Sequence, residues 1–283
     1  MKMSERCPMP TKAKDVVPCP PIPLRRSGVK DCPEGSETFT FGRFRFDFVA
    51  QDEFSLPRYK GSVFRGGFGL ALKRVSCSPQ RRTPCASCIL GDECAYARVF
   101  ETPVRPGDTG MIEGMSDAPH PLVLRPPMST RQLYRPRDPF DIEIILVGKA
   151  LRFLPHVICA FEDFSRMGFG PGKGRFEMRC VSAFVGGEWK RIYSCDERRL
   201  EPLAWTLTGV DQIGDSGMQR VDRVELKALT PIRIKADWAI TDNLSFDLLM
   251  KNILRRMEMV DSLHCEGKLR FDHERLLALS AHV

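Results

Sequence analysis

The sequence predicts an α+β protein that consists of two tandem ferredoxin-like (RRM-like) domains with a small zinc-binding insertion in the first. Strand and helix patterns alternate along the chain as strand, helix, strands and then again as strand, helix, strands, helix. The length of 283 residues is enough for two compact domains, and 42% hydrophobic with 28% charged residues is the balance of a globular protein. A cluster of four cysteines predicts the insertion.

The first domain is expected over residues 38–137 and the second over residues 138–283, after a leader over residues 1–37. The leader combines prolines, lysines and isolated cysteines without a hydrophobic period, so we interpret it as disordered or as extended on the surface. It lacks the apolar core of a signal peptide, and the chain contains no run of eighteen apolar residues. We therefore expect a cytoplasmic protein.

The first domain begins with a strand and an amphipathic helix. Phenylalanine alternates with other residues from Phe39 to Phe48, which predicts a half-buried strand. From Leu56 to Val75, apolar residues recur at helical spacing while basic residues follow another side of the helix. Three glycines inside this helix each cost roughly 1 kcal/mol relative to alanine, so we expect another backbone to approach closely there.

The cysteine-rich insertion spans residues 77–98. Its two-residue gap between Cys85 and Cys88 suits one tetrahedral ion, and Cys77 and Cys94 complete four ligands. A closed four-ligand site indicates structural zinc rather than a catalytic metal. A redox pair, an iron–sulfur cluster and free thiols are the alternatives, and spacing alone does not exclude the cluster.

The remaining elements follow from the same patterns. Residues 103–119 are polar and glycine-rich and predict a loop. Further strands are predicted over residues 122–124, 140–147, 175–184 and 224–235, and further helices over residues 155–167, 246–263 and 273–279.

A glycine-rich loop over residues 168–174 joins the helix that ends near Met167 to the following strand. A dinucleotide-binding loop would follow a strand and precede a helix, and a Walker loop would place serine or threonine after Lys173, where Gly174 stands. Neither nucleotide site is therefore predicted. The small residues instead expose backbone N–H groups that, with neighbouring cations, can approach phosphates. A glycine-capped helix followed by a turn is the alternative reading.

The order of these motifs resembles the CRISPR-associated RAMP endoribonucleases that process precursor CRISPR RNA, of the type with a C-terminal RAMP domain. The resemblance covers Phe39 to Leu279 and is strongest where helix, glycine-rich loop and strand follow one another. The segments that carry it are Phe64–Leu72, Cys85–Cys88, Cys94–Phe100, Leu122–Pro127, Leu151–Pro155, Arg166–Phe176, Leu229–Lys235 and Leu263–Cys265. Members usually continue beyond the position of Val283, so we expect the second domain to lack a closing strand.

The resemblance implies that two ferredoxin-like domains clasp a CRISPR repeat RNA, and the net charge of +7 is compatible with such a partner. It also implies cleavage without metal, in which the ribose 2′-hydroxyl attacks the adjacent phosphate and leaves a 2′,3′-cyclic phosphate. The first helix has no histidine, so Tyr59, Lys60 and Arg65 are the candidates for this chemistry. The expected RNA contacts are Arg58, Lys73, Arg166, Gly170, Gly172, Lys173, Gly174 and Arg175.

Two other functions stay open at this point. The chain can be a binder that no longer cuts, with Tyr59 packed and the cations only holding phosphate. It can also be a zinc-stabilised interaction subunit of a CRISPR effector complex, contacting other effector subunits more than RNA. The steepness of the salt dependence of binding separates an RNA partner from a protein partner.

Overall fold

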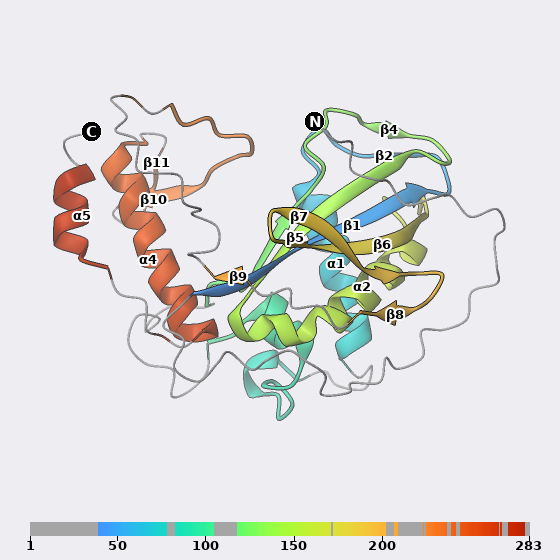
Figure 1. The fold of residues 1–283 in the computed structure, drawn as a ribbon, viewed down its shortest axis with the longest axis horizontal. Coiled ribbons are helices and arrows are strands. Elements are labelled where there is room, and N and C mark those ends of the chain that lie inside the picture. The colour runs from blue at the N-terminus through green and yellow to red at the C-terminus, as the bar shows by residue number, and fades with distance from the viewer. Residues whose placement is uncertain are drawn as a thin grey trace.

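The structure is a computed structural model, and it describes residues 39–77, 83–104, 118–170, 172–201, 207–208, 223, 225–236, 239–241, 244–265, 267 and 271–280. The predicted leader lies outside these ranges. Figure 1 shows one twisted sheet with helices α1 and α2 on one of its faces, and a C-terminal group of elements beside it. No helix within the described ranges is long and apolar enough to cross a membrane.

The main sheet has ferredoxin-like connectivity in its first part. The elements follow the order β1 (Thr40–Ala50), α1 (Gly61–Ser76), β3 (Leu122–Arg125), β5 (Pro139–Val147), α2 (Leu154–Met167) and β6 (Phe176–Val185). The strands pair antiparallel in the spatial order β3, β5, β1, β6, which is the order of a ferredoxin-like βαββαβ unit. The α+β class with an antiparallel sheet is therefore confirmed.

The strands β7 (Glu188–Ser194), β8 (Arg199–Leu200) and β9 (Leu207–Thr208) extend this sheet. β7 pairs with β6, β8 pairs with β7, and β9 pairs with the beginning of β1. β5 begins at Pro139 and pairs with β1 over nine residue pairs. β1, which precedes the boundary predicted between residues 137 and 138, thus pairs with β5, which follows it.

The core lies between the sheet and the two helices. Phe44, Phe46 and Phe48 of β1 are almost fully buried, and Phe161 of α2 stacks 4.8 Å from Phe68 of α1, measured between ring centroids. Gly67 and Gly69 of α1 allow the close approach that the sequence predicts, but to aromatic rings rather than to backbone, whereas Gly66 faces open space. A Cβ atom on Gly67 would lie 2.1 Å from the Phe164 ring, and one on Gly69 would lie 2.3 Å from the Phe100 ring.

The smaller elements surround this unit. A ribbon of β2 (Phe54–Ser55) and β4 (Leu133–Tyr134) lies beyond the end of β1, and residues 85–101 contain the short helices η1 (Cys85–Ser87) and η2 (Tyr96–Glu101). The short helix η3 (Gly148–Phe153) leads into α2, while β10 (Ile234–Ala236) and β11 (Ala239–Thr241) form a separate hairpin. The last helices are α4 (Phe246–His264) and α5 (His273–Ser280).

The C-terminal end of α4 is attached to the sheet unit. The His264 ring nitrogen Nε2 lies 2.7 Å from the carbonyl oxygen of Pro119. Val260 and Cys265 form a second small core with Val147, and Phe41 and Ile145 pack against it. This cluster is separate from the main core, because Phe41 lies on the face of β1 opposite to Phe44.

Candidate functional site

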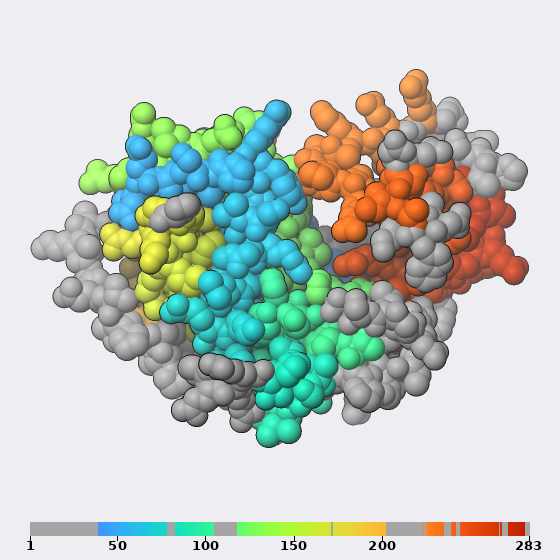
Figure 2. Space-filling model, turned by 180° about the vertical axis from the view of Figure 1, so that it is seen from behind, coloured from blue at the N-terminus to red at the C-terminus, as the bar shows by residue number. Residues whose placement is uncertain are grey.

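The glycine-rich loop lies beside the segment that follows β1. The backbone N–H groups of Gln51 and Asp52 donate to the carbonyl oxygen of Arg175 at 2.9 and 3.1 Å. Gly174 is buried against Phe54, where a Cβ atom would lie 2.4 Å from the Phe54 Cβ. The space-filling view shows the yellow loop region against the blue region after β1 (Figure 2). Two segments that are far apart in sequence therefore form one end of the molecule.

The loop has a fixed base and an exposed tip. Phe169 and Gly174 exchange two backbone hydrogen bonds of 2.9 and 3.1 Å, and the Phe169 ring is buried among the rings of Phe54, Phe64, Phe164 and Phe176. This cluster anchors the base of the loop.

At the tip, Gly170 and Gly172 are exposed, and a Cβ atom on either would have no neighbour within 4 Å. Gly170 has φ +62°, a conformation that L side chains rarely adopt, and Lys173 also has positive φ, at 48°. The tip therefore presents backbone to its surroundings with little side-chain bulk. The glycine-capped turn and the exposed backbone, alternatives in the sequence, are both features of this loop.

The cations around the loop differ in how much of their charge is available. Arg175 is exposed but forms a two-contact ion pair with Asp52, at 2.8 Å from Nε to Oδ2 and 3.3 Å from Nη2 to Oδ1. This hydrogen bonding lowers the pKa of Asp52 and raises that of Arg175. Lys173 and Arg58 are exposed, and among the described residues neither has an acidic partner. Within the described part of the chain, Lys173 and Arg58 are thus cations near the loop whose charge no carboxylate shares.

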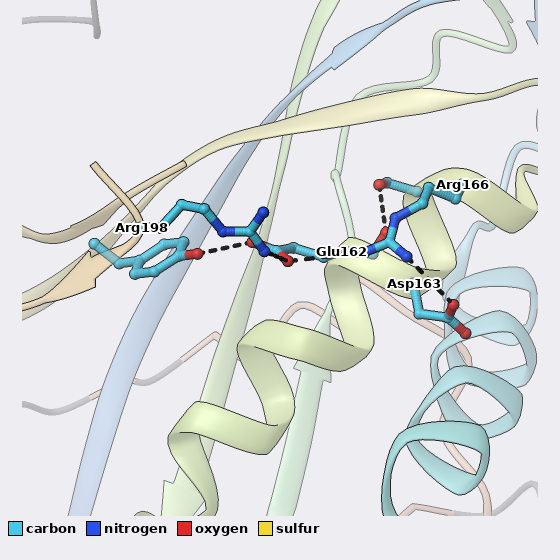
Figure 3. Close-up of polar contacts among 6 residues, drawn as sticks. Glu162, Asp163, Arg166 and Arg198 are labelled. Atoms are coloured by element: carbon cyan, nitrogen blue, oxygen red, sulfur yellow. Dashed lines mark hydrogen bonds and ion pairs between the residues drawn. The ribbon is translucent and has the colours of Figure 1, made fainter. Parts of the chain in front are cut away.

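Arg166, the predicted RNA contact at the end of α2, is held by carboxylates. Its guanidinium lies 3.9 Å from Glu162 and 4.0 Å from Asp163 of the same helix (Figure 3). Glu162 is buried, and it also accepts hydrogen bonds from the Tyr193 hydroxyl at 2.7 Å and from Arg198 at 3.3 Å. Burial and the hydrogen bond to Glu162 raise the pKa of Tyr193. This network ties α2 to β7, and Arg166 lies at its exposed edge.

The three candidates for catalysis have different surroundings. Tyr59 is 46% exposed, and its ring covers Gly61 at the start of α1. Lys60 is buried at 1% exposure, and its Nζ donates to the carbonyl oxygens of Ser129 at 2.6 Å and of Arg58 at 3.5 Å. Burial lowers the pKa of this amine. In this arrangement the Lys60 ammonium contacts backbone oxygens rather than the surface.

The remaining predicted cations of α1 rest on aromatic rings. The Arg65 guanidinium lies 4.6 Å from the centroid of the Phe100 ring, and the Lys73 ammonium lies 5.3 Å from that of Tyr96. Both side chains are exposed, and both rings belong to η2. The structure thus places these cations along α1 toward the cysteine-rich insertion, whereas Lys173 lies on the glycine-rich loop.

Within the described residues none of the four cysteines of the insertion forms a disulfide, and all four side chains are of intermediate exposure. Burial, followed by the charges of Glu101 and Cys94, raises the pKa of Cys85. In the part of the chain that the structure describes, no group of three or more His, Cys, Asp or Glu side chains is gathered for a metal. The thiols are therefore not arranged as a ready ligand set, and the zinc site stays a prediction for metal analysis to test.

Sequence reasoning missed two features of this end of the molecule. Asp52 neutralises Arg175 from a position 123 residues away, and no local pattern signals such a pair. Arg137, exposed and with φ of 76°, lies in the turn before β5 and was not among the predicted contacts. Its neighbours Arg131 and Asp138 form an ion pair.

Comparison with known proteins gives three findings. Residues 39–204, more than half of the chain, match the family model described as AF_1859_N, N-terminal domain. An uncharacterized protein of Archaeoglobus fulgidus is 26% identical over 184 residues, which are 65% of this chain and 58% of that relative. A chain in the crystal structure of the Csm3-Csm4 subcomplex of the type III-A CRISPR-Cas interference complex aligns with a TM-score of 0.35 and 11% identity, over 56% of this chain and 93% of that chain. This last likeness is too low to assign a shared fold or function.

Proposed function

The chain belongs to the AF_1859_N domain family, and we propose that it binds RNA through the glycine-rich loop and the segment after β1. The observation that carries this proposal is the loop tip, in which exposed backbone at Gly170 and Gly172 adjoins the unshared charge of Lys173. Backbone N–H groups and cations without acidic partners are the groups that contact nucleic-acid phosphates. The buried Phe169 ring and its hydrogen bonds to Gly174 anchor the start and end of the loop and leave Gly170 and Gly172 exposed.

We propose CRISPR repeat RNA as the substrate class. Support comes from the sequence motifs, above all the segment from Leu151 to Phe176, in which a helix, the glycine-rich loop and a strand follow in the order of the RAMP endoribonucleases. Arg58 is the second expected phosphate contact, because it is exposed and follows β1 on the segment that packs against the loop. The net charge of +7 favours a polyanionic partner.

Binding is better supported than cleavage. An attack by the 2′-hydroxyl needs a base, an acid and a cation close to one phosphate. Tyr59 and Arg65 are exposed, but the Lys60 amine is buried and donates to two carbonyl oxygens. We therefore propose an RNA binder, in which any transesterification depends on Tyr59 and Arg65 while Lys60 holds the start of α1.

Fluorescence anisotropy with a labelled CRISPR repeat RNA tests the binding proposal. Each phosphate contact contributes a slope of about −0.7 to the dependence of log K on log salt for single strands, so Lys173→Ala should flatten the slope by about that amount. Lys149→Ala is the matched control, because Lys149 is also exposed but follows β5 at the opposite end of the sheet. We expect its slope to equal that of the unchanged protein.

Two results would overturn the proposal. If the double variant Lys173→Ala, Arg175→Ala binds the repeat RNA as tightly as the unchanged protein, the loop has no role in binding. If the unchanged protein shows weak binding without salt dependence, the alternative of a protein-interaction subunit is favoured. Incubation with the same RNA carrying a deoxyribose at the cut site tests cleavage separately, because this change removes the attacking hydroxyl.

A further inference from the structure

A second surface with nucleic-acid chemistry lies on the other face of the sheet. Alternate residues of β1 point away from α1 and α2, among them Arg43 and Arg45, whose side chains are each 23% exposed. Phe184 of β6 and Trp189 of β7 form a cross-strand pair on the same face. At one end of this face Phe41 is covered by the end of α4, and the arginines follow beyond it.

The guanidinium groups of the two arginines lie close to the two aromatic rings. The Arg43 guanidinium is 4.4 Å from the centroid of the Phe184 ring and 5.7 Å from that of Trp189, while Arg45 is 5.1 Å from Trp189. The two rings themselves meet edge to face at 5.2 Å. Four planar groups from three neighbouring strands therefore form one stacking platform, which we define as Arg43, Arg45, Phe184 and Trp189.

Carboxylates orient the platform and connect it to a groove. Glu143 of β5 accepts from Arg43 and from Arg125 of β3, each at 2.8 Å. Arg125 and Glu143 also line a groove of about 480 Å³. The groove holds cations, aromatic rings and carboxylates together, including Arg125, Arg131, Tyr134, Phe140, Asp141 and Glu143. Its volume suits one small planar ligand with several hydrogen-bonding edges.

The groove also adjoins the glycine-rich loop. Tyr134, which lines the groove, stacks on Phe54 at 5.4 Å, and Phe54 packs against Gly174 at the base of the loop. Buried Lys60 also holds part of the groove lining in place, because its ammonium donates to the carbonyl oxygen of Ser129, a lining residue. Buried rings thus connect the base of the loop to the groove, and Glu143 connects the groove to Arg43 of the platform.

We propose that the platform and the groove bind the bases of single-stranded RNA, with one base stacked on Trp189 and one nucleotide in the groove. Single-stranded RNA is recognised by stacking of splayed bases on aromatic rings and guanidinium planes. The inference rests on the proposed RNA binding and extends it from phosphates at the loop to bases on the sheet.

Anisotropy with a labelled oligouridine of about 12 nucleotides tests the platform in the full chain. Stacking on one aromatic side chain predicts that Trp189→Leu weakens binding about 5- to 150-fold. Arg45→Gln should weaken it less, because it removes one cation and leaves both rings in place. Arg256→Gln, which changes an exposed arginine of α4, is the control and should bind as the unchanged protein does.

Tryptophan fluorescence supplies a readout that a merely structural role would not change. Stacking of a base on Trp189 should quench its emission, and Trp189→Phe should remove this quenching while keeping most of the affinity. Circular dichroism checks that each variant is folded. If Trp189→Leu does not fold, Arg45→Gln still tests the platform.

The outcomes separate the inference from the proposed function. If the unchanged protein binds oligouridine and both folded platform variants bind equally well, the platform has no role in RNA binding, whereas binding at the loop stands. The same result is expected if this face covers a protein partner. If the unchanged protein binds neither oligouridine nor repeat RNA at any salt concentration, the proposed function and the inference are both wrong.

Discussion

Protonation of His264 should release α4 from the sheet unit at acidic pH. His264 is 5% exposed, and its Nε2 donates to the Pro119 carbonyl. Burial disfavours the charged ring, so the folded protein holds the neutral form near pH 7. Burial lowers its pKa from 6.5 to about 4, against the opposing effect of the hydrogen bond to Pro119, and the charges of Arg98 and Lys149 add to the lowering. The histidine must therefore either stay neutral or leave its site.

The sign and size of the effect follow from the two pKa values. Between pH 6.5 and about 4 the unfolded chain binds a proton at His264 and the folded chain does not, so stability falls as the pH falls through this window. The loss is complete a little below the folded pKa, and at about pH 4 it amounts to about 3 kcal/mol. Above pH 6.5 this histidine contributes no pH dependence.

Urea unfolding of the unchanged protein and of His264→Gln at about pH 7.5 and about pH 4 measures this contribution. Glutamine does not titrate, and its side-chain N–H can replace the donor to Pro119. Other groups titrate equally in both proteins, so the unchanged protein should lose about 3 kcal/mol more than the variant. Hydrogen exchange should show the loss first in α4. Equal losses in the two proteins would refute the assignment of the acid sensitivity to His264.

Three further changes test other parts of the structure. Gly174→Ala places a methyl group 2.4 Å from the Phe54 Cβ, so it should lower the free energy of unfolding by about 1–3 kcal/mol. Gly172→Ala, in open space, is the control and should change it little. Thermal melts that coincide for the two variants would argue against this packing. Glu162→Gln removes the carboxylate shared by Tyr193 and Arg198, so it should lower the free energy of unfolding, measured with urea, by about 1–3 kcal/mol. Glu188→Gln, at an exposed position, is the control and should lower it little. Equal decreases in the two variants would mean that the buried network contributes nothing. Metal analysis of protein purified without chelator tests the proposed zinc site: we expect about one zinc per chain, lost in Cys88→Ser, and a variant that keeps its full metal content would contradict the site.

The elements of this fold are predictable from local patterns, but their pairing is not. The sequence predicts a helix from Pro155 to Met167 and a strand over residues 140–147, and the structure has α2 over Leu154–Met167 and β5 over Pro139–Val147. Alternation shows that a strand has one buried face and does not show which strand lies beside it. Phe140 of β5 pairs with Phe48 of β1, and this non-local contact joins the two predicted domains into one sheet.

Some features of the candidate site are likewise predictable from the local sequence, and others are not. Positive φ at Gly168 and Gly170 and the exposed tip follow from glycine content, because these are conformations that glycine adopts at no steric cost. The burial of Lys60 and the ion pair of Arg175 do not follow, since lysine is rarely buried and the partner Asp52 is distant in sequence. Residue type alone therefore overestimates the charge available at this site.

The spacing of the phenylalanines in β1 predicts which face of the strand each of them occupies. The phenylalanines change phase at Gly42, so that Phe44, Phe46 and Phe48 face α1 and α2 while Phe41 faces the end of α4. The phase that buries the later phenylalanines also places Arg43 and Arg45 on the opposite face.

Ordering an arginine side chain costs about 2 kcal/mol of rotamer entropy, and a solvated arginine avoids that cost. Arg43 is nevertheless held by Glu143 and by two rings, and Arg45 lies over Trp189 and contacts Asp47. Planar cations held in fixed positions on a sheet lose less freedom when a base stacks on them than mobile ones would. This preorganisation would lower the entropic cost of stacking a base on the platform.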